Sequence, residues 1–247
     1  MKKPYIKKYG EIEGFIIWIV DGKYIRENID EEFTNFGQYY RFPFIPKKEF
    51  WIDKEYGDGD EIDYYVSNLL TENRLMSQGK SYYEAGERGD RVEQRERKKH
   101  ELIIKGIERK KHEKDKINCV HKKIVKKYSK NVKVWLVNGR LVRDLFFIDF
   151  TEGGHDKVYP FIPENEIWID DDVNPDERKF VLLHEMHERN LMEKGWPYDL
   201  NDKRSIIAKG DKRAKLHKSA HQDASKIEHF CRLHPKQTEN KLKKEVR

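Results

Sequence analysis

Cysteine is scarce in this sequence, and long apolar runs are missing. The chain of 247 residues has two cysteines, Cys119 and Cys231, which are too few for a disulfide framework and predict a reducing, cytoplasmic setting. The apolar stretch FIIWIV (15–20) is far shorter than the roughly 20 residues that span a bilayer. No small-residue cleavage site follows it, so we expect neither a signal peptide nor membrane association.

Charge is abundant and unevenly distributed. Charged residues make up 39% of the chain and hydrophobic residues 36%, but aromatic residues reach 12%, which favours packed cores over disorder. The net charge is +6. Residues 95–130 hold 15 Lys and Arg against five Asp and Glu, a local charge of +10 that leaves −4 for the rest. This segment is either a solvated linker or a contact for nucleic acid.

A repeat organises the chain. Two blocks recur at an offset of 117, namely WIVDGKYIREN (18–28) as WLVNGRLVRDL (135–145) and FPFIPKKEFWID (42–53) as YPFIPENEIWID (159–170). A third recurs at an offset of 116, LLTENRLMSQG (69–79) as EMHERNLMEKG (185–195). We therefore predict a tandem duplication, with a first repeat at 1–94, a basic helical connector at 95–130 and a second repeat at 131–247.

Each repeat is predicted to be a small α+β module, a twisted antiparallel sheet backed by two helices. Asp21-Gly22 and Asn138-Gly139 separate short apolar runs, which indicates hairpin turns. The segment EIWID (166–170) alternates apolar and polar residues, as a half-buried strand does.

Two helices are predicted in the second repeat. Asn174 is a suitable N-cap and Pro175 a suitable first residue for a helix over 175–194 that ends at Gly195. A last helix is predicted over 214–231.

Histidine distinguishes the two repeats. The first 99 residues contain none, whereas seven of the ten histidines lie between 131 and 235. The aligned pairs at the positions of interest are His184 and Asn68, Glu185 and Leu69, Glu188 and Glu72, and His221 and Gly86. Because the same scaffold is expected to fold without the imidazoles, they indicate a site confined to the second repeat.

The spacing of these residues is typical of a metal site. His184 and Glu188 stand at i and i+4, so they share one face of the predicted helix and can bind one ion. A catalytic zinc needs three protein ligands and an exchangeable water, and His221 on the last helix is the candidate third ligand. His217 and Glu228 are alternatives. Glu185 would then accept a proton from the zinc-bound water.

A family resemblance supports this interpretation. The run EIWIDDDVNPDERKFVLLHEMHE (166–188) resembles the strand–loop–helix segment of short zincin-type metallopeptidases of the ImmA/IrrE kind. The positions that match the pattern are Ile167, Ile169, Asn174, Phe180, His184 and Glu185. A downstream helix supplies a glutamate ligand in that family, and His221, Ala224 and Ile227 match its spacing with His in place of Glu.

The resemblance also has a clear departure. Glu188 stands where the family has a second motif histidine, so the sequence is HExxE rather than HExxH. The resemblance therefore implies exchanged ligands, His–Glu–His instead of His–His–Glu, and an association with phage or mobile-element proteins.

These observations predict a zinc-dependent hydrolase, a minimal zincin-like metallopeptidase that acts on a polypeptide. The alternative is a non-enzymatic binding protein with two docking faces and a connector that contacts nucleic acid, any metal then being structural.

Overall fold

The computed structural model describes residues 4–57, 59, 61–99, 113–199 and 219–246. It divides into two compact units. The first unit combines Met1–Asn118 with Arg140–Asp149, and the second combines Cys119–Gly139 with Phe150–Arg247. Helix α6 (Gly139–Leu145) therefore belongs to the first unit for almost its whole length, although its sequence lies in the second repeat.

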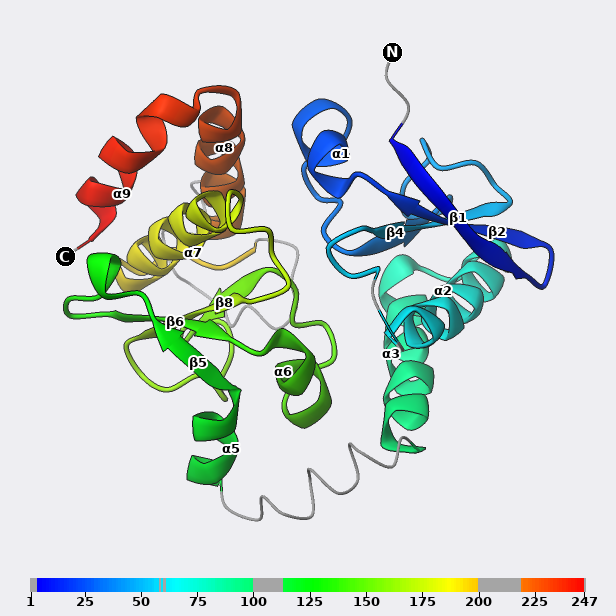
Figure 1. Cartoon of the computed structure of the whole chain (residues 1–247), viewed down its shortest axis with the longest axis horizontal. Coiled ribbons are helices and arrows are strands. Elements are labelled where there is room, and N and C mark those ends of the chain that lie inside the picture. Colours follow the sequence, from blue (N-terminus) through cyan, green and yellow to red (C-terminus); the bar gives the residue numbers. More distant parts are fainter. Residues whose placement is uncertain (1–3, 58, 60, 100–112, 200–218, 247) are drawn as a thin grey trace, which may run out of the picture. The chain divides into compact units, whose positions relative to one another are not determined.

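Both units mix helices and strands, as the α+β prediction requires (Figure 1). The first unit contains β1 (Tyr5–Ile12), β2 (Phe15–Val20), α1 (Gly22–Asn28), β3 (Phe36–Gln38), β4 (Glu49–Asp53), α2 (Glu61–Ser77) and α3 (Tyr82–Lys99). Helix α5 (Glu113–Val120) leads into the second unit. That unit contains β5 (His121–Ile124), η1 (Lys126–Tyr128), β6 (Lys133–Val137), β7 (Gly153–His155), β8 (Glu166–Asp170), α7 (Arg178–Glu193), α8 (Ala220–Leu233), η3 (Pro235–Gln237) and α9 (Thr238–Glu245).

In the described part of the chain each unit has one four-stranded sheet, and both sheets are mixed rather than antiparallel. The strand orders are β1-β2-β4-β3 and β5-β6-β8-β7. The central pairs, β2 with β4 and β6 with β8, are parallel. The prediction of a purely antiparallel sheet was wrong in this respect, because a helix and a short strand separate the two central strands and let the chain return in the same direction.

The two sheets pair their strands at matching positions. Trp18 lies opposite Trp51 in the first sheet, and Trp135 lies opposite Trp168 in the second. Both residues of the second pair stand 117 positions after those of the first, which is the offset of the sequence repeat.

The predicted hairpin turns are helix starts instead. Helix α1 begins at Gly22, whose backbone N–H donates to Asp53 Oδ1 at 3.2 Å. A Cβ atom at this glycine would lie 1.8 Å from Asp53 Oδ2, so any larger residue would displace the buried carboxylate. Gly139 is in the same position, since its Cβ would lie 2.0 Å from the carboxylate of Asp170. The Gly in each motif is thus required by a close approach to a buried carboxylate.

The helices that follow each sheet pack in pairs. In the first unit α2 lies beside α3, and in the second α7 lies beside α8 and also contacts α9, β7 and β8 (Figure 1). Helix α7 begins three residues later than predicted, at Arg178, because Asn174 accepts the N–H of Asp176 in a turn that precedes the helix. Helix α8 begins at Ala220, where the Ser219 hydroxyl caps it by accepting the N–H of Gln222.

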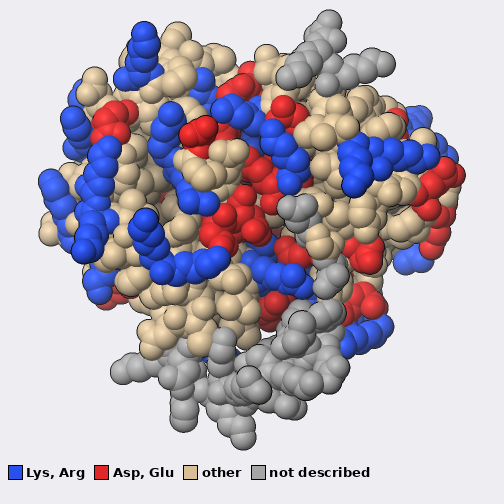
Figure 2. Space-filling model, in the orientation of Figure 1, with Lys and Arg blue, Asp and Glu red and all other residues tan. Residues whose placement is uncertain are grey.

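The cores are apolar and the surface is highly charged. The second core is formed by α7, β6 and β8, with Leu183 and Val134 fully buried, and Leu242 of α9 joins it. On the face shown in Figure 2, Lys and Arg side chains are interspersed with Asp and Glu. Among the described residues, no helix has both the length and the apolarity needed to cross a membrane.

Candidate metal centre

Three of the predicted site residues meet between α7 and α8. His184 and Glu188 lie one turn apart on α7, and His221 lies in the first turn of α8. His221 Nδ1 is 2.8 Å from Glu188 Oε2 and 3.2 Å from His184 Nε2, and the latter is 3.4 Å from Glu188 Oε2. The predicted ligand set therefore converges on one point.

These distances fit a tetrahedral metal ion. Ligand atoms that lie about 2.0–2.2 Å from zinc at tetrahedral angles are about 3.4 Å from each other. The three donor atoms found here are separated by 2.8, 3.2 and 3.4 Å, so small shifts would accommodate an ion. Two imidazoles with one carboxylate are also a donor set that zinc commonly binds.

Glu228 orients His184. Its Oε2 lies 2.8 Å from His184 Nδ1, on the side of the ring that faces away from Glu188. Arg232 fixes this carboxylate by donating from Nε and Nη2 to Oε1 at 3.0 and 2.7 Å, and its Nη1 donates to Glu177. If His184 Nδ1 carries the proton that Glu228 accepts, Nε2 keeps its lone pair for a metal. Glu228, an alternative ligand in the sequence, thus occupies a supporting position.

His155 supports Glu188 from the other side. It is fully buried at the end of β7, and its Nε2 lies 2.8 Å from Glu188 Oε1. Its Nδ1 accepts the backbone N–H of Lys157 at 3.2 Å, so the neutral ring carries its proton on Nε2 and donates it to Glu188. This bond occupies Oε1. The other oxygen, Oε2, lies closest to His184 and His221 and is the one that can offer a lone pair to a metal.

Sequence reasoning did not place His155 in the site. It belongs to a three-residue strand with no periodic pattern, and its contact with Glu188 spans 33 positions. The sequence repeat could have identified His155, which aligns with Gln38 at the offset of 117. Here too the second repeat has an imidazole where the first has none.

Glu185 lies beside this cluster. A carboxylate oxygen of Glu185, a ring nitrogen of His155 and an oxygen of Glu188 lie within 4.8 Å of one another. Burial and the charge of Glu188 raise the pKa of Glu185 far above its usual value. A cation bound at the cluster would oppose this shift, because an adjacent positive charge favours the ionised carboxylate.

His184 and Glu188 have oppositely perturbed pKa values. Burial lowers the pKa of His184, but its contacts with Glu188 and Glu228 outweigh burial and raise it well above the usual value. Burial raises the pKa of Glu188, but the bonds from His155, His184 and His221 outweigh it and hold that pKa far below the usual value. The cluster therefore attracts positive charge, whether as a proton or as a metal ion.

Two other histidines near these positions are not part of the cluster as described. His187 Nδ1 lies 2.9 Å from Glu245 Oε1, and its Nε2 lies 3.1 Å from Asp223 Oδ2, so it joins α7 to α9 and α8. His217, the other alternative ligand, is outside the described residues.

The first unit has the same supporting contacts without the imidazoles. Asn68 Nδ2 donates to Glu93 Oε2 at 2.8 Å, and Arg97 donates from Nε and Nη2 to Glu93 Oε1 at 3.0 and 2.9 Å. Arg97 Nη1 also reaches Glu61, as Arg232 reaches Glu177. The glutamate–arginine contact is therefore common to both units, whereas the described histidines that face it occur in the second.

Comparisons with family profiles, curated proteins and solved structures gave no match.

Proposed function

We propose that the second unit is a zinc-dependent hydrolase of the zincin-like type, and that its substrate is a peptide bond. The observation that supports this best is the convergence of His184 Nε2, Glu188 Oε2 and His221 Nδ1, with separations of 2.8 to 3.4 Å. The orienting contacts of Glu228 and His155 add support, because ligands of catalytic zinc are normally held by such outer carboxylates and hydrogen bonds.

Each residue has a distinct role in this proposal. His184, Glu188 and His221 would hold the zinc, which would supply the Lewis acidity that lowers the pKa of a water to about 7 and polarises a carbonyl. Glu185 accepts the proton of the attacking water and returns it to the leaving amine. The side chain of His221 is 30% exposed, against 11% for His184 and 3% for Glu188, so the cluster is most open to a substrate at His221.

The proposal includes a tandem duplication in which the first unit is a degenerate copy. The matching strand orders, the Trp pairs at an offset of 117 and the shared glutamate–arginine support are consistent with a common ancestor. In the first unit Gly86 aligns with His221, and a Cβ atom there would lie 3.5 Å from Glu72 Oε1. The first unit then acts as a scaffold or a partner-binding module.

A structural zinc site is the second candidate. Its support is burial, because His155 is fully buried and Glu188 is only 3% exposed. In that case the protein is a binding protein, and the basic segment 95–130 is its candidate contact for nucleic acid.

Measurement of the zinc content tests the metal site. Protein purified without a histidine tag is expected to hold about one zinc per chain, and His184→Ala is expected to lose it. His187→Ala is the matched control on the same helix and should keep the metal, since His187 contacts Glu245 and Asp223 instead. A metal content that is near zero, or equal in both variants, contradicts the site.

Glu185→Gln is the decisive variant for catalysis. It is expected to keep the metal and to lose at least 100-fold in the rate of hydrolysis of an unstructured protein such as casein, as loss of a general base requires. Retained zinc with no hydrolysis by the unmodified chain would favour the structural candidate.

A further inference from the structure

The first unit has an open, basic groove between α2 and α3. Its volume is about 580 Å³. The lining residues that matter here are Arg74, Leu75, Arg88, Arg91, Val92 and Arg95. The two apolar side chains, Leu75 and Val92, are half-buried, and the arginines around them are exposed.

Two glutamates, Glu84 and Glu87, also line the groove, and they pair with Lys80 and Arg91. Three arginines remain in excess of these pairs. Among the described residues, the side chains of Arg74, Arg88 and Arg95 form neither an ion pair nor a hydrogen bond. Arg91 is different, because it pairs with Glu87 at 3.2 Å. The groove therefore combines an apolar floor with uncompensated positive charge, a pattern typical of a surface that binds an anionic partner.

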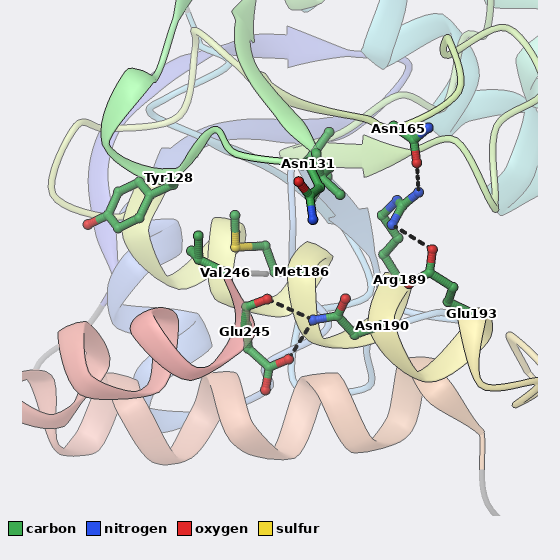
Figure 3. Close-up of a pocket in the computed structure, with 11 residues that line it drawn as sticks. Tyr128, Asn131, Asn165, Met186, Arg189, Asn190, Glu193, Glu245 and Val246 are labelled. Carbon is green, nitrogen blue, oxygen red and sulfur yellow. Dashed lines mark hydrogen bonds and ion pairs between the residues drawn. The ribbon is translucent and has the colours of Figure 1, made fainter.

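In the second unit the corresponding groove is filled by helix α9. Leu242 of α9 is fully buried in the core, and Ile227 of α8 packs against the same cluster. Asn190 of α7 donates to the carbonyl oxygen of Glu245 at 3.0 Å and to its Oε2 at 2.8 Å (Figure 3). His187 also binds Glu245, at 2.9 Å. An apolar anchor and a carboxylate thus hold a helix in this position.

The positions that contact α9 are those that line the open groove. The repeat offset of 116 pairs Thr71 with His187 and Arg74 with Asn190. The offset of 135 that pairs Glu93 with Glu228 also pairs Arg88 with Asp223 and Val92 with Ile227. The first unit therefore has a groove that corresponds to the one filled by α9, but no described helix occupies it. At its edges Arg74 replaces Asn190, and Arg88 replaces Asp223.

We propose that this groove binds an acidic amphipathic helix of another protein, with an apolar side chain on Leu75 and Val92 and carboxylates on Arg74, Arg88 and Arg95. Helix α9 of a second copy is a poor occupant, because it carries Lys241, Lys243 and Lys244 and would meet like charge. The groove is lined only by residues of α2, α3 and their connection, so this inference is independent of the metal centre.

Helical peptides derived from the α9 sequence test the inference against the full chain. The probe is a fluorescein-labelled, side-chain-stapled peptide of residues 235–246 with Lys241→Glu, Lys243→Glu and Lys244→Glu, since an unconstrained helix of this length is marginal in water. Fluorescence anisotropy is expected to give at least tenfold tighter binding than the same peptide with its lysines. Adding Leu242→Glu should abolish binding, because it removes the apolar anchor.

Two protein variants locate the binding. Arg74→Glu/Arg88→Glu is expected to weaken the acidic peptide at least tenfold, whereas Lys7→Glu/Lys47→Glu, the same charge change at other exposed positions, should alter it less than twofold. Equal losses in both variants, or unchanged binding of the Leu242→Glu peptide, would mean non-specific attraction and overturn the proposal. A labelled 20-nucleotide single strand that binds more tightly than the peptide and responds to the first variant would assign the groove to nucleic acid instead.

Discussion

Oε2 of Glu228 lies 2.8 Å from Nδ1 of His184, on the opposite side of the ring from the cluster. This contact selects the tautomer of the histidine and points its second nitrogen at Glu188 and His221. The corresponding contact in the first unit joins Asn68 to Glu93 at the same distance, 2.8 Å. The carboxylate is therefore present in both units, and it contacts a histidine in the second and an asparagine in the first.

Glu228→Gln is expected to weaken metal binding without removing the site. The amide has one acceptor oxygen in place of two, so it cannot accept from both His184 and Arg232, and it lacks the charge that makes the imidazole a better ligand. Loss of such an outer partner typically costs about 10- to 100-fold in metal affinity. Zinc affinity measured by competition with a chromophoric chelator checks this, and an unchanged affinity would show that Glu228 does not act on the metal.

His155→Gln recreates in the second unit the residue found at the aligned position of the first. Without the bond from His155 Nε2, the Glu188 carboxylate can rotate and is no longer held in place for the metal. Zinc affinity is therefore expected to fall about tenfold or more, while the stoichiometry stays at one zinc per chain. If His155 were instead a required ligand, the zinc content itself would fall well below one. The ratio of bound zinc to protein after dialysis separates these outcomes.

Zinc is expected to stabilise the second unit against heat. A ligand present at 100 times its Kd adds about 2.7 kcal/mol to the free energy of unfolding. For a chain of this size that corresponds to roughly 5–10 °C in Tm. Calorimetry with zinc and with a chelator measures the shift, which should persist in His187→Ala and vanish in His184→Ala. A shift of equal size in both variants would place the zinc elsewhere.

The first unit is expected to lose stability as pH rises from about 5 to 8. Burial raises the pKa of Glu72 to about 7, and burial and the charge of Asp149 raise that of Asp90 to about 8. A carboxyl whose pKa is higher in the folded state than in the unfolded chain stabilises the fold only while protonated, so its contribution is full below pH 4 and is lost as it ionises.

Glu72→Gln isolates this effect. At pH 8 the variant is expected to have a free energy of unfolding about 3 kcal/mol higher than that of the unmodified chain, and near pH 4.5 the two are expected to match. Urea titrations at these two pH values give the comparison. Equal stability of the two proteins at pH 8 would show that Glu72 ionises without penalty.

The repeat also explains why aligned glutamates have opposite pKa shifts. Glu188 receives bonds from three histidines and has a lowered pKa, whereas burial and the charge of Asp149 raise the pKa of Glu72 despite its bond with Gln38. The same position on the helix is thus a stable anion in one unit and a partly protonated carboxyl in the other near neutral pH.

Local sequence patterns predicted some features well and others poorly. Helical periodicity predicted α7 and the shared face of His184 and Glu188, because i and i+4 contacts depend only on the helix. The Asp-Gly and Asn-Gly motifs were misassigned as hairpins, because the requirement for Gly22 comes from Asp53, which is 31 positions away. The contact of His155 with Glu188 was missed for the same reason.

The position of α6 has a consequence for how the chain folds during synthesis. Arg143 of this helix donates to Glu61 of α2 at 2.9 Å, and both side chains are buried. Glu61 leaves the ribosome 82 residues before its partner. The first unit therefore cannot form this buried ion pair until Arg143 has been synthesised. Because the unit combines two separate stretches of the chain, no single cut would separate it intact.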